Sequence, residues 1–175
     1  AYGASEVASK ASRLLVVVAV ARTLDLTQIG IAAAAIAAGD ILKALTENGV
    51  GQRIIAARDA DLDETCATAH RIFWVWCTGL FVAQACIAAG LYYIGASPLL
   101  AGLVFLMGAE YLFMPAGLVQ VALAMRAGKL KQTAAIAGTQ FVGGNLLEIV
   151  LIMVWPSAIA LVLPRVLSAP IWLIA

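Results

Sequence analysis

The chain has 175 residues, of which 63% are hydrophobic and 12% are charged, and its formal net charge is +1. This composition is far more apolar than that of soluble domains, and a nearly neutral chain gives no electrostatic basis for a nucleic-acid partner. The three cysteines form neither a disulfide framework nor a Cys-x-x-Cys metal motif. We therefore expect a membrane protein without a metal site or cofactor, whose main partner is the lipid bilayer.

The first predicted helix covers residues 5–24, and its apolar part is short. Glu6, Lys10 and Arg13 are spaced by four and three residues, so they share one helical face. A polar face on a membrane helix avoids lipid and turns toward protein or water. Lys10 and Arg13 are therefore candidates for lining a polar cavity.

The second predicted helix covers residues 28–45, with Thr27 as the expected N-cap. A long polar connection follows at 47–71 and contains Asp59-Ala60-Asp61. This Asp-x-Asp pattern matches the one that binds metal-nucleotide in some sugar transferases. Solvated acidic loop residues are far more common, so we expect no metal here.

The central stretch, residues 72–109, contains no charged residue and no histidine. A single membrane-crossing helix needs about 20 apolar residues, so this stretch is nearly two spans long. Gly95-Ala96-Ser97-Pro98 in its middle predicts a turn and hence a helical hairpin. The second arm continues past Glu110 and contains Pro115, which cannot donate to the Tyr111 carbonyl, so a kink and a gating point are expected there.

A basic turn at 126–131 precedes a fifth span at about 133–155, and a sixth span begins near residue 158 after a turn at Pro156. The sequence thus predicts an all-α polytopic bundle of about six transmembrane helices with both termini cytoplasmic. Most basic residues outside the spans fall on one side, which marks the cytoplasm, whereas Arg22 does not fit this pattern. The cytoplasmic set is Arg53, Arg58, Arg71, Arg126, Lys129 and Lys131.

Four ionisable side chains fall inside the predicted spans: Asp40, Glu110, Glu148 and Arg165. A charge at that depth is costly unless it faces a partner or a water-filled cavity. Folding each hairpin at its turn places three polar pairs at similar depth: Glu148 with Arg165, Glu110 with Gln84, and Asp40 with Lys10. Structural pairing and substrate contact both remain open for these side chains.

Four stretches of the chain resemble segments of a known transporter family. They are Arg22-Thr23-Leu24 with Gln28-Ile29-Gly30, the segment 48–55, Met114-Pro115-Ala116-Gly117 leading to the basic turn, and Trp155 with the segment 160–162. In order and spacing they resemble lipid-linked oligosaccharide flippases of the multidrug/oligosaccharidyl-lipid/polysaccharide exporter superfamily. Asp25 and Arg165 depart from the family pattern.

The resemblance implies two six-helix lobes around a central cavity, with residues 1–175 as a single transmembrane domain, the N-terminal lobe, cut within its sixth helix. Its implied partners are a lipid-linked saccharide and the second lobe. It implies a transporter rather than an enzyme, one that exports lipid-linked oligosaccharide or polysaccharide precursors across the bacterial inner membrane. Three alternatives remain: a cation-coupled drug or metabolite exporter with Asp40 or Glu110 as the coupling acid, a membrane-bound sugar-phosphate transferase using Asp59 and Asp61, and a structural partner subunit with no cavity of its own.

Overall fold

The computed structural model describes residues 2–45 and 49–168, and this part of the chain is helical apart from its turns. The helices are α1 (Tyr2–Thr23), α2 (Leu26–Ala44), α3 (Val50–Ala56), α4 (Leu62–Tyr93), α5 (Pro98–Gly108), α6 (Glu110–Arg126), α7 (Leu130–Val154) and α8 (Ala158–Ser168), with a 3-10 turn, η1, at Asp59–Asp61. The predicted all-α fold is confirmed.

Four helical segments of the described chain are long and apolar enough to cross a membrane: Leu26–Ala44, Asp59–Tyr93, Pro98–Arg126 and Thr133–Val154. α8 is apolar but shorter. α1 has 22 residues but carries Lys10, Arg13 and Arg22. All six predicted segments are therefore helical, and the chain is a multi-pass membrane helix bundle.

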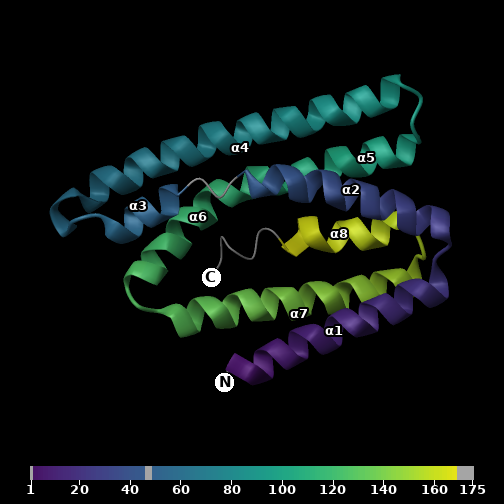
Figure 1. Cartoon of the computed structure of the whole chain (residues 1–175), viewed down its shortest axis with the longest axis horizontal. Coiled ribbons are helices and arrows are strands. Elements are labelled where there is room, and N and C mark those ends of the chain that lie inside the picture. The colour runs from purple at the N-terminus through teal and green to yellow at the C-terminus, as the bar shows by residue number, and fades with distance from the viewer. Residues whose placement is uncertain (1, 46–48, 169–175) are drawn as a thin grey trace.

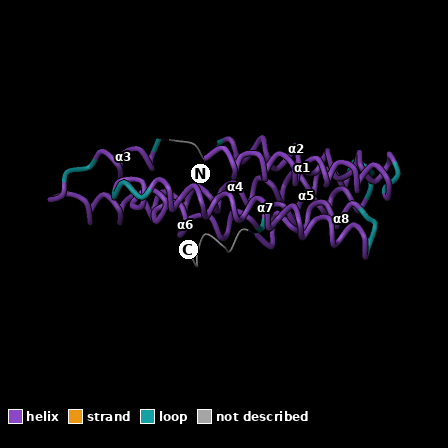
Figure 2. The backbone as a smooth tube through the Cα atoms, turned by 90° about the horizontal axis from the view of Figure 1, so that it is seen from below, coloured by secondary structure: helices purple, strands orange, loops and turns teal. Residues whose placement is uncertain are grey.

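Consecutive spans run up and down the bundle, and their turns gather at its two ends (Figure 1). One end holds the α1–α2, α4–α5 and α7–α8 turns, whereas α3 and the α6–α7 turn lie at the other (Figure 1). Gly95, with φ 83°, follows α4, and Pro98 begins α5, so the predicted hairpin turn is confirmed. Seen from the side, the helices form a flat slab (Figure 2).

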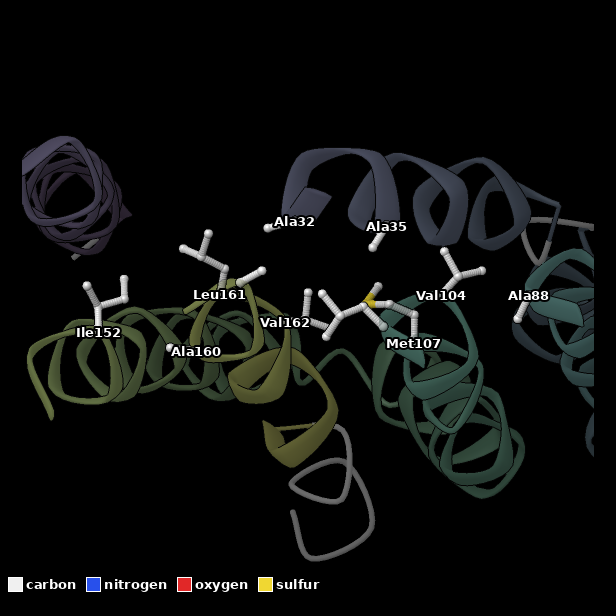
Figure 3. Close-up of a cluster of buried hydrophobic side chains, with 11 residues drawn as sticks. Ala32, Ala35, Ala88, Val104, Met107, Ile152, Ala160, Leu161 and Val162 are labelled. Carbon is white, nitrogen blue, oxygen red and sulfur yellow. The ribbon is translucent and has the colours of Figure 1, made fainter. Parts of the chain in front are cut away.

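The main core lies where α2 meets α5 and α8 (Figure 3). Ala32 and Ala35 of α2 are buried and face Leu161 of α8 and Met107 of α5 (Figure 3). A Cβ atom on Gly39 would stand 2.7 Å from the Cε atom at the flexible end of Met107, so the Met107 side chain packs directly on α2 at this glycine. Small residues line this helix contact, as is usual in membrane bundles.

The segment between α2 and α4 differs from the sequence prediction. α4 begins at Leu62 rather than near residue 72, and the predicted connection contains α3. The buried side chain of Ile54 on α3 packs in one cluster with Ala69 and Phe73 of α4 and Val119 of α6. α4 has 32 residues, a length of about 48 Å at 1.5 Å per residue, so its polar first turns extend beyond a hydrocarbon core of about 30 Å.

Two further local features also differ from expectation. The Asp25 side chain, rather than Thr27, caps α2 by accepting a 2.7 Å hydrogen bond from the Gln28 backbone N–H. The second arm of the hairpin, predicted to continue to about residue 124 with a kink at Pro115, is divided at Ala109 into α5 and α6. The interruption lies before Pro115, which is fully buried inside α6. The gating role of Pro115 stays a prediction.

Candidate functional site

A cavity of about 760 Å³ lies between α1 and α7 on one side and α2, α6 and α8 on the other. Six charged side chains from these five helices line it: Arg13, Asp40, Lys43, Glu110, Glu148 and Arg165. Three are cationic and three are anionic, so their formal charges cancel. Charged groups inside a membrane bundle are confined to such cavities because lipid cannot solvate them.

The first ion pair of the cavity joins α8 to α2. The Arg165 Nη1 atom lies 2.9 Å from the Asp40 Oδ1 atom and donates a hydrogen bond to it. The Arg165 side chain is 43% exposed and that of Asp40 is 53% exposed. A pair this open to the cavity keeps its charges accessible to a ligand.

The second ion pair joins α2 to α6. The Lys43 Nζ atom donates to the Glu110 Oε1 atom. Glu110 is the first residue of α6 and its side chain is only 13% exposed. Because a mostly buried carboxylate needs a cation or several donors to remain charged, Lys43 is the natural counter-ion of Glu110.

Arg13 and Glu148 complete the charged lining. Within residues 2–45 and 49–168 neither side chain forms an ion pair. Glu148 interacts electrostatically with Arg165, so Arg165 has a second carboxylate in its vicinity besides Asp40. Arg13 is therefore the cavity cation that no described carboxylate neutralises by direct contact.

Polar residues of α7 connect this helix to its neighbours beside the cavity. The Asn145 amide donates to the Ser12 hydroxyl of α1 at 2.8 Å, and the Gln140 amide donates to the Ser168 carbonyl of α8 at 2.9 Å. Gln140, Gly144 and Glu148 line the cavity at intervals of four residues. This four-residue spacing of polar and small residues in an otherwise apolar span indicates that one face of the helix is turned toward a cavity, and the pattern can be recognised in the sequence.

The remaining lining is largely apolar. Val16 and Val17 of α1, Phe141 of α7, Met114 of α6 and Leu161 of α8 all contribute to the wall. A single cavity thus presents charged groups beside hydrocarbon surface. Such a lining suits a ligand that has both a polar, charged part and an apolar part.

Five of the six charged candidates named from the sequence lie in this one cavity: Arg13, Asp40, Glu110, Glu148 and Arg165. Lys10 is exposed on α1 and Pro115 is fully buried in α6, and neither lines the cavity. Lys43, Gln140 and Asn145 also line the cavity, and the sequence alone did not single them out.

The direct ion pairs differ from the pairings predicted from hairpin depth. Arg165 forms its ion pair with Asp40, while it also interacts electrostatically with its predicted partner Glu148, and Glu110 pairs with Lys43. The Gln84 side-chain amide donates instead to the Val104 carbonyl at 3.0 Å. Depth within a hairpin compares only helices adjacent in sequence, whereas both observed pairs join helices that are separated along the chain.

The acidic motif outside the membrane is engaged by arginines. Arg126 donates to the Asp59 carboxylate at 2.6 Å, and Arg58 lies 3.8 Å from the Asp61 carboxylate. Among the described residues no group of three or more His, Cys, Asp or Glu side chains is arranged to hold a metal ion. Both contacts are surface ion pairs, and the Asp59 and Asp61 side chains are mostly exposed.

The fold and the cavity define a class: a polytopic membrane protein whose helices enclose an amphiphilic, charged chamber. Residues 19–175 match the family described as polysaccharide biosynthesis protein, and the chain belongs to that family. The predicted family of polysaccharide exporters is thereby confirmed. No curated protein matches the chain, and no solved structure does either.

Proposed function

We propose that the chain is one lobe of a membrane transporter that moves lipid-linked oligosaccharide or polysaccharide precursors across the bacterial inner membrane. The observation that carries the proposal is the amphiphilic cavity in a polysaccharide biosynthesis protein. In this proposal the chain binds and releases its substrate without catalysing a covalent reaction, and the second lobe implied by the resemblance faces the cavity.

The chemistry of the lining supports this substrate class. A lipid-linked saccharide carries phosphate, and a guanidinium binds phosphate oxygens through two parallel hydrogen bonds. Arg13 and Arg165 supply guanidinium groups, and the polar amides of Gln140 and Asn145 suit sugar hydroxyls. The apolar wall around Phe141 suits the first part of the lipid chain.

In the cavity without substrate, four of the charged side chains are held in ion pairs. Asp40 holds Arg165 while no substrate phosphate is present, because the carboxylate satisfies the guanidinium in place of an anionic ligand. An entering phosphate then competes with Asp40 for Arg165. Arg13, with no described carboxylate in direct contact, is the cation that meets the phosphate first.

A cation-coupled exporter of the same superfamily is the rival function. It would use Asp40 or Glu110 as the coupling acid, and both carboxylates face the cavity. Each of them, however, already has a cationic partner in Arg165 or Lys43. Saccharide export and drug efflux, measured in the same cells, distinguish the two functions.

The test of the proposed function is a double substitution of the Asp40–Arg165 pair. In cells whose surface polysaccharide depends on this protein, Arg165→Ala alone should lower both membrane level and export, because Asp40 loses its partner. Adding Asp40→Asn should restore the membrane level while export stays at least tenfold low, because the phosphate ligand is still missing.

The matched control is Arg58→Ala with Asp61→Asn, which removes an exposed pair far from the cavity. This control should leave both membrane level and export near the wild-type values. Full recovery of export in the Arg165→Ala, Asp40→Asn double variant would contradict a substrate-binding role for Arg165.

The proposed orientation has α3 and the α6–α7 turn in the cytoplasm, because Arg53, Arg58 and Arg126 gather at that end of the bundle. Cys66, in the second turn of α4, then lies on the cytoplasmic side and is partly exposed. A membrane-permeant thiol reagent should label it in intact cells, whereas an impermeant one should not. Labelling by the impermeant reagent would reverse the orientation.

A further inference from the structure

The junction between α5 and α6 departs from regular α-helical hydrogen bonding. The Ala109 N–H donates to the Leu106 carbonyl at 3.1 Å, and the Leu112 N–H donates to the Ala109 carbonyl at 3.2 Å. Both bonds span three residues, as in a 3-10 helix, and such a stretch inside a helix often marks a hinge. Pro115 adds to this softness because it cannot donate to the Tyr111 carbonyl.

Close packing against α4 fixes the α5 side of the junction. A Cβ atom on Gly108 would stand 3.2 Å from the Gln84 Cγ atom, so the two helices approach closely at this point. The Gln84 side chain is fully buried and its Nε2 atom donates to the Val104 carbonyl of α5 at 3.0 Å. Its Oε1 atom accepts no hydrogen bond from the described residues.

α2 holds the other side of the junction. The buried Tyr111 hydroxyl donates to the Gly39 carbonyl at 2.9 Å, one residue after Glu110 forms its ion pair with Lys43. The first turn of α6 is therefore attached to α2 by two polar contacts, and one of them lies in the cavity.

The C-terminal end of α6 is hydrogen-bonded to α3. Arg126, the last residue of α6, donates to the carbonyls of Ile54, Ile55 and Ala57 around the C-terminus of α3. The Ile54 cluster packs α3 against both α4 and α6. The Arg126 bonds add directional contacts between α3 and α6, so α3 is attached more firmly to α6 than to α4.

We propose that α6 is a lever that pivots at Gly108–Ala109 and carries α3 with it, so that a change at the Glu110–Lys43 pair in the cavity moves α3 at the opposite end of the helix. Gln84 and Tyr111 are the positioning residues that hold the pivot. α6 has 17 residues, about 25 Å, so each 10° of pivoting moves its far end by about 4 Å.

Distances between spin labels test the lever in the protein reconstituted in lipid. Cys66, Cys77 and Cys86 are first replaced by Ala. One label at Gly102 of α5 serves as the reference, since Gly102 is exposed with open space around it. The second label is placed either at Met125, near the end of α6, or at Gln52 on α3, and both positions are exposed.

Glu110→Gln, which removes the cavity ion pair, should shift the distances from residue 102 to residues 125 and 52 by similar amounts of several ångströms. Tyr111→Phe removes only the hydroxyl that bonds to α2, and it should shift both distances in the same way. Gln84→Leu removes the hydrogen bond to the Val104 carbonyl, and it should also shift both distances. Adding Arg126→Ala to Glu110→Gln should keep the shift at residue 125 and abolish it at residue 52.

The control is Gly90→Ala on α4, where a Cβ atom meets nothing within 4 Å, and it should leave both distances unchanged. Unchanged distances in Glu110→Gln, Tyr111→Phe and Gln84→Leu, all inserted at wild-type levels, would refute the pivot. A shift at residue 125 without one at residue 52 in Glu110→Gln would refute the transmission to α3. None of these results depends on which substrate the cavity takes.

Discussion

Lys43→Met should lower the free energy of unfolding by about 3 kcal/mol, the largest effect that we expect from a single charged residue of the cavity. The substitution leaves Glu110, whose side chain is only 13% exposed, without its cation. Adding Glu110→Gln should recover most of the loss, because a neutral amide does not require a counter-ion. Titration with sodium dodecyl sulfate, followed by circular dichroism, measures these differences.

Arg58→Ala is the matched control for Lys43→Met. Its pair with Asp61 spans 3.8 Å, and the two side chains are 90% and 60% exposed. Exposed pairs of this kind contribute at most about 1 kcal/mol, so the control should be nearly neutral. A loss for Lys43→Met no larger than that of Arg58→Ala would show that Glu110 is satisfied in another way.

Arg126→Ala should release α3 from α6. The Arg126 side chain is 20% exposed and donates to three backbone carbonyls at the end of α3 as well as to Asp59. Hydrogen bonds from a charged donor each contribute about 1.5–3 kcal/mol, and the freed carbonyls are partly screened by water. We therefore expect amide hydrogen exchange across residues 50–57 to accelerate about a hundredfold.

Asp59→Ala separates the contribution of the backbone carbonyls from that of the ion pair. Asp59 is 97% exposed, so its loss should change exchange in α3 by no more than about threefold. Exchange in Arg126→Lys should fall between the two, since the guanidinium bonds the carbonyls through Nη1 and Asp59 through Nη2, whereas an ammonium group has a single nitrogen for both contacts. Equal acceleration in Asp59→Ala and Arg126→Ala would contradict this assignment.

Local sequence signals predicted the boundaries of most spans. Gly95 with Pro98 placed the hairpin turn between α4 and α5, and Pro156 placed the turn before α8. These turns follow from backbone geometry, because proline cannot continue a helix and glycine tolerates a positive φ. The helix α3 was missed because it has only seven residues, and its stability comes from packing Ile54 against α4 and α6.

The sequence by itself also predicted four of the charges that line the cavity, although it did not single out Lys43. A charged side chain inside a span must avoid lipid, and this cost alone selected Asp40, Glu110, Glu148 and Arg165, which all reached one cavity. Only the tertiary structure decided their partners, because α2 packs against α8 and α6, which are distant in sequence, so that Arg165 meets Asp40 and Glu110 meets Lys43. The break at Ala109 likewise lies between two contacts with other helices, that of Gly108 with Gln84 and the Tyr111–Gly39 hydrogen bond. Such contacts between helices leave no periodic signal in a single chain.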